Sequence, residues 1–426
     1  MALRQSRKSP AAGGADAVSV FAEPTDRVRP LWITSVVLVN VGINIAFFGP
    51  IQVLLGNQAE ALDPHGKEAI LALVTGCGAA VSLVANPLFG TFSDRTTSRL
   101  GRRAPWVLAG AVLGTLALVG LAAAPNVAAM AALWCLVQLG CNGALAAITA
   151  AVPDRVPVLQ RGNVGGLASL GTVLGIVGGA AVAAAVGRNY AYGYWVCAAA
   201  LLFGVLLYLF AGQDEQLDPA LRSPFSRAGF FRGFWISPAR YPDFGWAWLT
   251  RFLVNLGNHL VTLYLLFFLQ DAVHFPNPNL GVFILTGIYA AATMVTAVIG
   301  GLWTDRVGKR KPFVIGSSAI IALASLILAV VPTWNGALTG AAVLGIGYGA
   351  YLAVDFALLT QVLPSALSRA KDLGIINVAN SLPQVVAPVV AYPFVKLLGG
   401  YVTLYIVAAV IGLLGAFFVV KIKGVQ

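Results

Sequence analysis

The chain has 426 residues, of which 58% are hydrophobic and only 10% are charged, and its formal net charge is +11. This composition excludes an ordinary water-soluble domain, in which about a quarter of the residues are charged. The basic excess lies in short segments between apolar runs, so it indicates membrane topology and no nucleic-acid partner. The four cysteines fall inside apolar runs at spacings that match no zinc or iron–sulfur pattern, so we expect no metal and no other cofactor.

Apolar runs long enough to cross a bilayer, which takes roughly 20 residues, recur along the chain. Backbone groups in lipid must be bonded within their own segment, and the alternating pattern of a β-barrel strand is missing, so we predict a helix for each run. The result is an all-α membrane protein with twelve transmembrane helices in two pseudo-symmetric six-helix bundles. The predicted spans lie near Leu31–Leu55, Glu68–Phe92, Trp106–Ala124, Val127–Val152, Gly162–Val186, Tyr192–Ala211, Gly245–Phe268, Leu280–Trp303, Phe313–Val331, Ala337–Val362, Gly374–Leu398 and Val402–Val420.

Polar segments divide the chain into regions. Residues 1–30 lack the apolar core of a secretory signal and predict a disordered cytoplasmic tail. Residues 213–244 predict a cytoplasmic linker between one bundle over 31–212 and another over 245–426. Arg and Lys concentrate in alternate loops, within residues 95–103, 155–161, 222–240, 306–311 and 369–371. Because positive loops stay inside, we predict an inner-membrane protein with both termini in the cytoplasm.

One loop pattern occurs twice. Residues 90–105 begin GTFSDR and end GRRAP, and residues 301–312 begin GLWTDR and end GKRKP. A spacing of 207 residues relates the two GRRAP-like ends, and the same spacing relates Pro157 to Pro364, which close the fourth and tenth runs. A duplicated six-helix unit is typical of transporters that work by alternating access around a site at the middle of the bilayer.

The repeated loop resembles the signature of the major facilitator superfamily, in which a Gly and an Asp-Arg pair precede a second Gly and a basic cluster. The resemblance covers the chain after the tail and implies a secondary transporter. Residues 93–106, SDRTTSRLGRRAPW, also resemble the sugar:cation symporters of the glycoside–pentoside–hexuronide and sucrose type. That resemblance implies uptake of a glycoside with protons or sodium. The chain departs from the melibiose-type pattern because its first two runs carry no aspartate.

The charged residues of the two loops are candidates for a gate. A carboxylate and guanidinium groups at helix ends can pair in one conformation and separate in another. The positive-inside rule alone explains the arginines but leaves unexplained why the aspartate recurs in both loops. The candidate gating residues are Asp94, Arg95, Arg102, Arg103, Asp305, Arg306 and Arg310.

Ionisable side chains inside apolar runs are costly and therefore predict functional positions. Asp355 and Arg251 lie inside different spans, at depths of about 13 Å and about 9 Å from the same membrane face, so we expect them to face each other or to form one ion pair. His259 lies two turns from Arg251 and changes charge near neutral pH, so it completes the candidate proton-coupling set. An ion pair that only holds two helices together is the alternative.

Amides at three- or four-residue spacing follow several spans, where they must point at other helices or at water. As a set they suit a sugar, whose hydroxyls bind amides and whose ring packs on an aromatic face. Packing between helices is the alternative for each of them. The candidate substrate-binding residues are Asn40, Asn44, Gln138, Asn142, Asn255, His259, Tyr348, Tyr351, Asn377, Asn380 and Gln384.

Three functions fit these observations. Proton-coupled symport of a sugar or glycoside fits the amides, the single buried acid and the loop pattern. Proton-coupled efflux of amphipathic small molecules fits the superfamily equally, and the glycines at 171, 175, 178 and 179 resemble in part a motif of drug:proton antiporters. A membrane sensor or scaffold is the third, although no appended domain supports it. No nucleotide loop, nucleophile motif or metal set indicates an enzyme. We expect a monomer whose partners are a small-molecule substrate, protons and the lipid bilayer.

Overall fold

The computed structural model describes residues 24–211, 214, 216–217, 241–307, 310–361 and 369–423, without the side chains of residues 158–159, 305 and 356–377. The first half contains α2 (Pro30–Gly49), the π-helical turn η1 (Pro50–Leu54), α3 (Leu55–Leu62), α4 (Lys67–Ser93), α5 (Ala104–Ala122), α6 (Val127–Arg155), α7 (Val158–Val186) and α8 (Tyr190–Ala211). The second half contains α10 (Pro242–Leu263), α11 (Leu265–Asp271), α12 (Pro278–Val307), α13 (Lys311–Val330), α14 (Trp334–Gln361), α15 (Arg369–Lys396) and α16 (Gly400–Val419).

The helices agree with the predicted membrane spans. Within the described residues, 11 helices are long and apolar enough to cross a membrane, and α10 with α11 makes a twelfth span. The predicted all-α fold with twelve transmembrane helices is therefore confirmed. Helical structure already begins at Pro30 and Pro242, inside the segments predicted as tail and linker. Residues 1–23 and most of the predicted linker lie outside the described residues.

Local sequence signals fix where several helices begin. Proline occupies one of the first two positions of α2, α5, α10 and α13. Proline suits this place because the first backbone N–H groups of a helix have no partner within the helix. At the start of α6, the side chain of Asn126 accepts a hydrogen bond of 2.9 Å from the backbone N–H of Ala129. This N-cap satisfies one of those free donors.

The seventh span is not the uninterrupted helix that we predicted over Gly245–Phe268. It bends by 41° between α10 and α11, at Tyr264. The backbone of Tyr264 leaves the helical region, with φ −101° and ψ 15°. Its buried hydroxyl donates to the backbone carbonyl of Glu68 on α4, at 3.3 Å. A contact with the other half therefore accompanies the bend, which no proline marks in the sequence.

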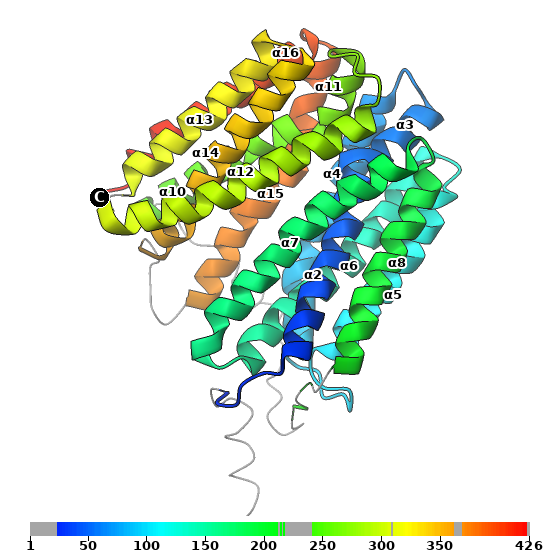
Figure 1. Cartoon of the computed structure of the whole chain (residues 1–426), viewed down its shortest axis with the longest axis vertical. Helices are drawn as coiled ribbons and strands as arrows, with labels where there is room; N and C mark the ends of the chain where they lie inside the picture. The colour runs from blue at the N-terminus through cyan, green and yellow to red at the C-terminus, as the bar shows by residue number, and fades with distance from the viewer. Residues whose placement is uncertain are drawn as a thin grey trace, which may run out of the picture.

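The two halves lie side by side and contact each other mainly through two helix pairs, α4 with α15 and α7 with α12 (Figure 1). We call the end at which α2 begins and α16 ends the terminal end, and the other the opposite end. At the opposite end α3 and α11 lie together, in the upper right of Figure 1. The lower parts of α7 and α12 point in different directions in the same view.

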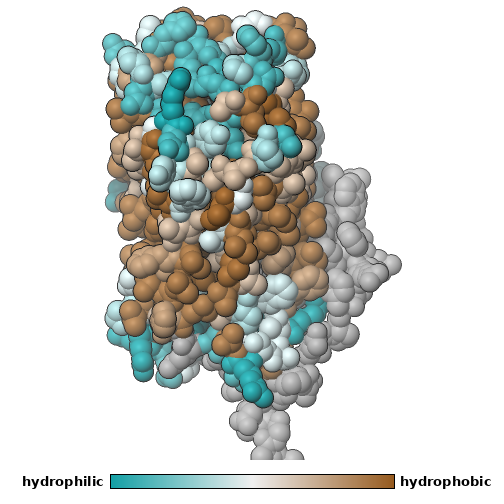
Figure 2. Space-filling model, turned by 90° about the vertical axis from the view of Figure 1, so that its right-hand side faces the viewer, coloured by the Kyte–Doolittle hydropathy of each residue, from teal (hydrophilic) through white to brown (hydrophobic). Residues whose placement is uncertain are grey.

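The outer surface is apolar around its middle. Figure 2 shows a broad hydrophobic band between two hydrophilic ends. On α12 alone, the exposed fractions are 66% for Val298, 62% for Leu302 and 61% for Trp303. Exposing so many apolar side chains to water would be unfavourable, whereas contact with lipid tails is favourable. The protein is thus a multi-pass membrane protein.

Candidate functional site

A buried ion pair joins two helices of the second half. Arg251 Nη1 on α10 lies 2.5 Å from Asp355 Oδ2 on α14, and their side chains are only 13% and 8% exposed. The other carboxylate oxygen, Asp355 Oδ1, accepts a 2.6 Å hydrogen bond from the hydroxyl of Tyr351, one turn earlier on the same helix face. Arg251 Nε is buried and has no hydrogen-bond partner among the described residues. The expected contact is present, with one donor left over.

Two asparagine–tyrosine pairs extend this polar network along α10. Asn255 donates to the backbone carbonyl of Arg251 at 2.9 Å and accepts a 3.0 Å hydrogen bond from Tyr348 of α14. Nearly one turn further, Asn258 accepts a 3.3 Å hydrogen bond from Tyr289 of α12. Asn258 and Tyr289 were missing from the sequence-based candidates. The three-residue step from Asn255 to Asn258 was the available signal.

The remaining candidates of the second half stand apart from this network. The ring of His259 on α10 is half-buried and makes no hydrogen bond to the described residues. On α15, Asn380 is exposed and Gln384 is half-buried, whereas the side chain of Asn377 lies outside the described part. The structure therefore joins Arg251 to Asp355 but leaves His259 unconnected to them.

In the first half, Asn40 and Asn44 lie in a packed helix interface. Their amide nitrogens donate to carbonyls of the preceding turn of α2, those of Val36 at 2.9 Å and of Asn40 at 2.8 Å. Both side chains are buried against the glycines of α7: a Cβ built at Gly175 would lie 2.5 Å from Asn44 Cβ. These contacts favour the packing interpretation for both asparagines.

Gln138 and Asn142 form a pair on α6. The amide nitrogen of Asn142 donates to the backbone and side-chain oxygens of Gln138, at 2.9 and 3.0 Å. Trp134, one turn earlier, is fully buried, and a Cβ built at Gly78 of α4 would lie 2.4 Å from its ring. That ring therefore packs against α4 and offers no face to a ligand.

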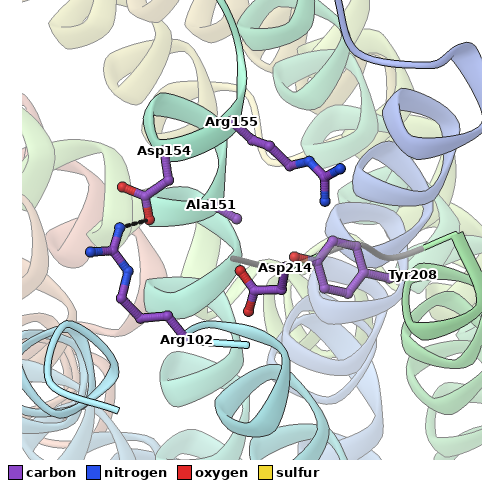
Figure 3. Close-up of a pocket in the computed structure, with 6 residues that line it drawn as sticks. All are labelled: Arg102, Ala151, Asp154, Arg155, Tyr208 and Asp214. Atoms are coloured by element: carbon purple, nitrogen blue, oxygen red, sulfur yellow. Dashed lines mark ion pairs between the residues drawn. The ribbon is translucent and has the colours of Figure 1, made fainter. Parts of the chain in front are cut away.

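A second charged cluster lies at the terminal end, around the loop between α4 and α5. Arg103 Nη2 lies 2.6 Å from Asp94 Oδ1, and its Nε lies 2.8 Å from Asp154 Oδ2. Arg102 Nη2 lies 2.6 Å from Asp154 Oδ2, and Figure 3 shows these two side chains pointing toward each other. Ser93 Oγ accepts a 2.6 Å hydrogen bond from Arg103. Asp154 lies at the end of α6, outside the repeated loop pattern, so no signal in the sequence indicated its part in this cluster.

Asp214, just after α8, ties the following segment to this loop. Its carboxylate accepts the backbone N–H groups of Arg103 and of Ala104, the latter at 2.7 Å, at the start of α5. Burial raises the pKa of Asp214 above its ordinary value, although these N–H groups and the Arg103 guanidinium oppose the shift. Gly101 has φ +96°, and a Cβ there would lie 2.3 Å from Asp214 Cβ, so the position needs glycine. The small cavity beside Asp214 in Figure 3 is lined by Arg102, Ala151, Asp154, Arg155, Tyr208 and Asp214.

The other candidate gating residues lie outside these ion pairs. Arg95 Nη1 donates to the backbone carbonyl of Thr91 at 3.3 Å. Arg306 is exposed, Arg310 is half-buried just before α13, and the side chain of Asp305 is not described. The ion pairs of Asp94 and Asp154 all join residues of the first half, so they do not bridge the two halves in this conformation.

At the opposite end, charged residues join the two halves directly. Lys67, at the start of α4, is 8% exposed; its Nζ lies 2.8 Å from Asp271 Oδ1 and 3.8 Å from Glu60 Oε1. The same nitrogen lies 4.8 Å from the centre of the Phe267 ring. Gln270 donates to Glu60 at 3.2 Å. Lys67 therefore links α3, α4 and α11 across the boundary between the halves.

A second contact at this end involves α15. Lys396 Nζ donates to the backbone carbonyl of His65 at 2.8 Å and lies 3.5 Å from Glu68 Oε2. Between the ends of α7 and α12, Asn279 of α12 donates to the backbone carbonyl of Gly187 at 2.6 Å. We call Glu60, Lys67, Glu68, Gln270, Asp271 and Lys396 the opposite-end lock. The structure thus has the halves joined at the opposite end.

Comparison with known families and proteins agrees with this architecture. The profile of the family described as Major Facilitator Superfamily matches residues 31–288 and 280–424. Multidrug resistance protein MdtL of Shewanella sp. (strain ANA-3) is 33% identical over 127 residues, which are 30% of this chain and 31% of that protein. Sucrose transport protein SUC4 of Arabidopsis thaliana is 33% identical over 93 residues, 22% of this chain and 18% of that protein. The chain thus aligns with less than a third of either relative's length.

Solved structures resemble the chain over nearly its whole length. A bacterial homolog of the human lysosomal transporter Spinster has a TM-score of 0.71 at 16% identity and covers 92% of this chain and 96% of its own. A mutant of the nucleoside transporter NupG has a TM-score of 0.74 at 15% identity, with coverages of 92% and 100%. A mutant of the peptide transporter POT has a TM-score of 0.77 at 13% identity, with coverages of 96% and 97%. At these identities the likeness shows the fold alone.

Proposed function

Because the chain belongs to the Major Facilitator Superfamily, we propose that it takes up a sugar or glycoside together with protons, by alternating access. The superfamily and the solved neighbours are membrane transporters, so the protein is a secondary transporter of a small molecule and not an enzyme. The observation that carries the proposed coupling is the buried Arg251–Asp355 ion pair between α10 and α14.

Asp355 is the proposed proton carrier. In its ionised form it binds Arg251 and Tyr351, so both carboxylate oxygens are occupied. Protonation removes the charge that holds the guanidinium, and the donors of Arg251 then become available to substrate hydroxyls. Proton and substrate binding favour each other by reciprocal linkage. A buried ion pair costs desolvation of two charges and is weak evidence for a purely stabilising role, which supports a functional one.

A sugar suits the polar groups beside this pair. Asn255, Tyr348 and the unpaired Nε of Arg251 offer amide, hydroxyl and guanidinium partners for hydroxyl groups. The local identity with a sucrose transport protein supports the same substrate class. Proton-coupled efflux of amphipathic molecules is the second candidate, and the identity with MdtL over 127 residues favours it.

The proposal also assigns an orientation of the molecule in the membrane. The basic loop over residues 95–103 lies at the terminal end, which supports placing this end and both termini in the cytoplasm of a cell with an inner membrane. In this proposal residues 1–30 are the tail, residues 31–212 and 245–426 are the two bundles, and residues 213–244 are the linker between them. The conformation with a joined opposite end is then the inward-facing one.

The variant Asp355→Asn tests the coupling, because asparagine mimics the protonated acid. A thermal-shift screen of glycosides against cationic dyes first identifies a ligand, since only molecules that bind the folded state raise the melting temperature. In proteoliposomes the variant should keep counterflow exchange of this ligand and lose its accumulation under a pH gradient. The matched control is Asp63→Asn, at an exposed loop acid, which should accumulate like the parent.

Two results would contradict the proposal. Accumulation at the parent level in Asp355→Asn would exclude Asp355 as the carrier, and His259 would be tested next. A melting temperature raised by cationic dyes and by no glycoside would favour efflux of amphipathic molecules over sugar uptake.

A further inference from the structure

Three tyrosine rings lie in a row beside the ion pair. The ring centres of Tyr289 and Tyr348 are 6.1 Å apart with their planes inclined by 28°, and those of Tyr348 and Tyr351 are 6.1 Å apart with an inclination of 31°. Tyr351 is fully buried, at 1% exposure, whereas Tyr289 and Tyr348 are half-buried. Tyr289 of α12, at one end of the row, and Tyr348 of α14, in its middle, are therefore the more accessible rings.

Hydrogen bonds fix the rings of this row. The hydroxyl of Tyr348 donates to Asn255, that of Tyr289 to Asn258, and both asparagines lie on α10. Each phenol has one proton, so these hydroxyl oxygens are left only as acceptors for a ligand. Such a ligand must bring its own hydroxyl donors and pack an apolar face on the rings, which is the chemistry of a sugar ring.

Two unused donors border the same rings. The amide nitrogen of Asn258 makes no hydrogen bond within the described part of the chain, and Arg251 Nε is buried without a partner there. Each of the two can donate to a different oxygen of a sugar, either a hydroxyl or the ring oxygen. The row therefore offers acceptors at its phenol oxygens and donors at its ends, arranged around an aromatic face.

The internal repeat shows that this arrangement belongs to one half only. The shared spacing of 207 residues matches the start of α14, Trp334, to the start of α6, Val127, and pairs Tyr348 with Cys141. The GTFSDR and GLWTDR sequences at the ends of α4 and α12 are 211 residues apart. Applied to the same two helices, this spacing pairs Tyr289 with Gly78. Gly78 and Cys141 are small and lie in close packing around Trp134 and Gly114. At the positions where the second half carries tyrosines, the first half thus has small residues in close helix packing.

We propose that Tyr289 and Tyr348 form the platform on which the ring of a glycoside stacks, with Asn258 as the amide that binds it. This inference rests on the proposed sugar transport and deepens it, because it places the substrate ring on α10, α12 and α14 of the second half. Tyr289 and Asn258 are then determinants of specificity that bring α12 into the site.

Equilibrium binding without any ion gradient tests the platform separately from coupling. The probes are p-nitrophenyl hexosides and an unsubstituted disaccharide, titrated into purified protein in detergent. Tyr289→Ala should weaken hexoside binding about tenfold, which corresponds to about 1.4 kcal/mol, because both the stacking on the ring and the apolar area that it buries are lost. Tyr289→Phe keeps the ring and should weaken binding about threefold, through the lost phenol oxygen.

The matched control is Tyr192→Ala on α8, where the tyrosine is exposed and its ring meets that of Trp195 edge to face, with 5.2 Å between the ring centres. Parental affinity in this control, together with the graded losses at position 289, supports the platform. Parental hexoside affinity in Tyr289→Ala overturns the platform alone and leaves proton-coupled sugar transport standing. Binding of cationic dyes by the parent, with no binding of any glycoside, overturns both proposals.

Discussion

Asp214 shows how one carboxylate can tie two segments together. It accepts the first backbone N–H groups of α5, where the helix dipole and Arg103 favour a negative charge, while its burial disfavours that charge. Burial prevails, so the pKa of Asp214 is raised. The neighbouring Gln216 donates to the backbone carbonyl of Arg99 at 2.8 Å, and Leu217 is buried. The segment after α8 is therefore held against the loop that carries Asp94.

The opposing effects at Asp214 predict a dependence of stability on pH. Because its pKa is raised above 3.8, the folded protein binds more protons than the unfolded chain between pH 3.8 and the raised value. Its contribution to stability falls as pH rises through this window. Asp214→Asn keeps an acceptor oxygen without the charge, so its melting temperature should increase relative to the parent across the window and then stay constant.

Asp214→Ala is the matched variant that removes the acceptor as well. Relative to Asp214→Asn, it should lose about 1 kcal/mol at every pH, the usual effect of a lost helix cap, because neither variant titrates at this position. Thermal unfolding in detergent, followed from pH 4 to pH 8, measures both differences. Equal melting temperatures of the Asn and Ala variants would show that the two hydrogen bonds contribute nothing.

At the residue scale the sequence could predict contacts within spans but missed those between loops. The depths of Arg251 and Asp355 followed from helix rise and from the rarity of charge in lipid, and the two form an ion pair. Asp154 and Asp214 lie at helix ends, where charges are common and carry no such signal. Tyr289 is a single aromatic residue in an apolar run, so only the structure relates it to Asn258.

Among the elements, α2 and α7 form a closely packed helix pair of the first half. A Cβ at Gly179 would lie 2.5 Å from the backbone nitrogen of Gly49, and one at Gly171 would lie 2.7 Å from the carbonyl oxygen of Val37. Backbones this close are typical of helices joined through small residues in membranes. Close packing of α7 on α2 therefore accounts for the glycines of the fifth apolar run. The partial resemblance to a motif of drug:proton antiporters is not needed to explain them.

Substitutions on one helix can test this explanation. In Gly175→Ala the new methyl group would lie 2.5 Å from Asn44 Cβ and 2.7 Å from the carbonyl oxygen of Val41, so α2 and α7 must separate. Such overpacking costs about 1–3 kcal/mol. Gly166→Ala on the same helix is the matched control, because no atom lies within 4 Å of its new methyl group.

The control should be neutral or stabilised by up to about 1 kcal/mol, since alanine has the higher helix propensity. Melting temperatures of the two variants in detergent give the comparison. A Gly175→Ala protein at least as stable as Gly166→Ala would contradict the close packing of α2 on α7.

The elements themselves were predictable because lipid requires long apolar helices. The bend at Tyr264 was not, since it depends on a contact with Glu68 of the other half and not on a helix-breaking residue. The π-helical turn Pro50–Leu54 had a partial signal in Pro50, which lacks a backbone N–H. Helix interruptions that depend on tertiary contacts do not alter the pattern of apolar residues along the chain, so that pattern does not predict them.

For the whole molecule, function requires that the two halves change their contacts. The structure joins them at the opposite end through ion pairs and hydrogen bonds of the lock. In the sequence, Lys67 and Lys396 are isolated positive charges in loops that otherwise carry few, and nothing along the chain relates them to Asp271 or Glu68. Contacts between halves depend on the conformation, so a sequence that folds into several states does not specify one of them.

The lock predicts that Lys67 controls how often the opposite end opens. Lys67→Ala leaves Glu60 and Asp271 near each other without the cation between them, which favours separation of the halves. The side chain of Asp271 is 36% exposed, so solvent screening limits the loss to about 1 kcal/mol, or about a fivefold change in the ratio of the two states.

Spin labels at Pro64→Cys and Pro276→Cys, in a background without native cysteines, report the distance across this end. The variant should populate longer distances, whereas Lys421→Ala at the terminal end, the matched control, should keep the parental distribution. A distribution unchanged by Lys67→Ala would mean that apolar contacts of α4 with α15 and of α7 with α12 hold the halves together without the ion pair.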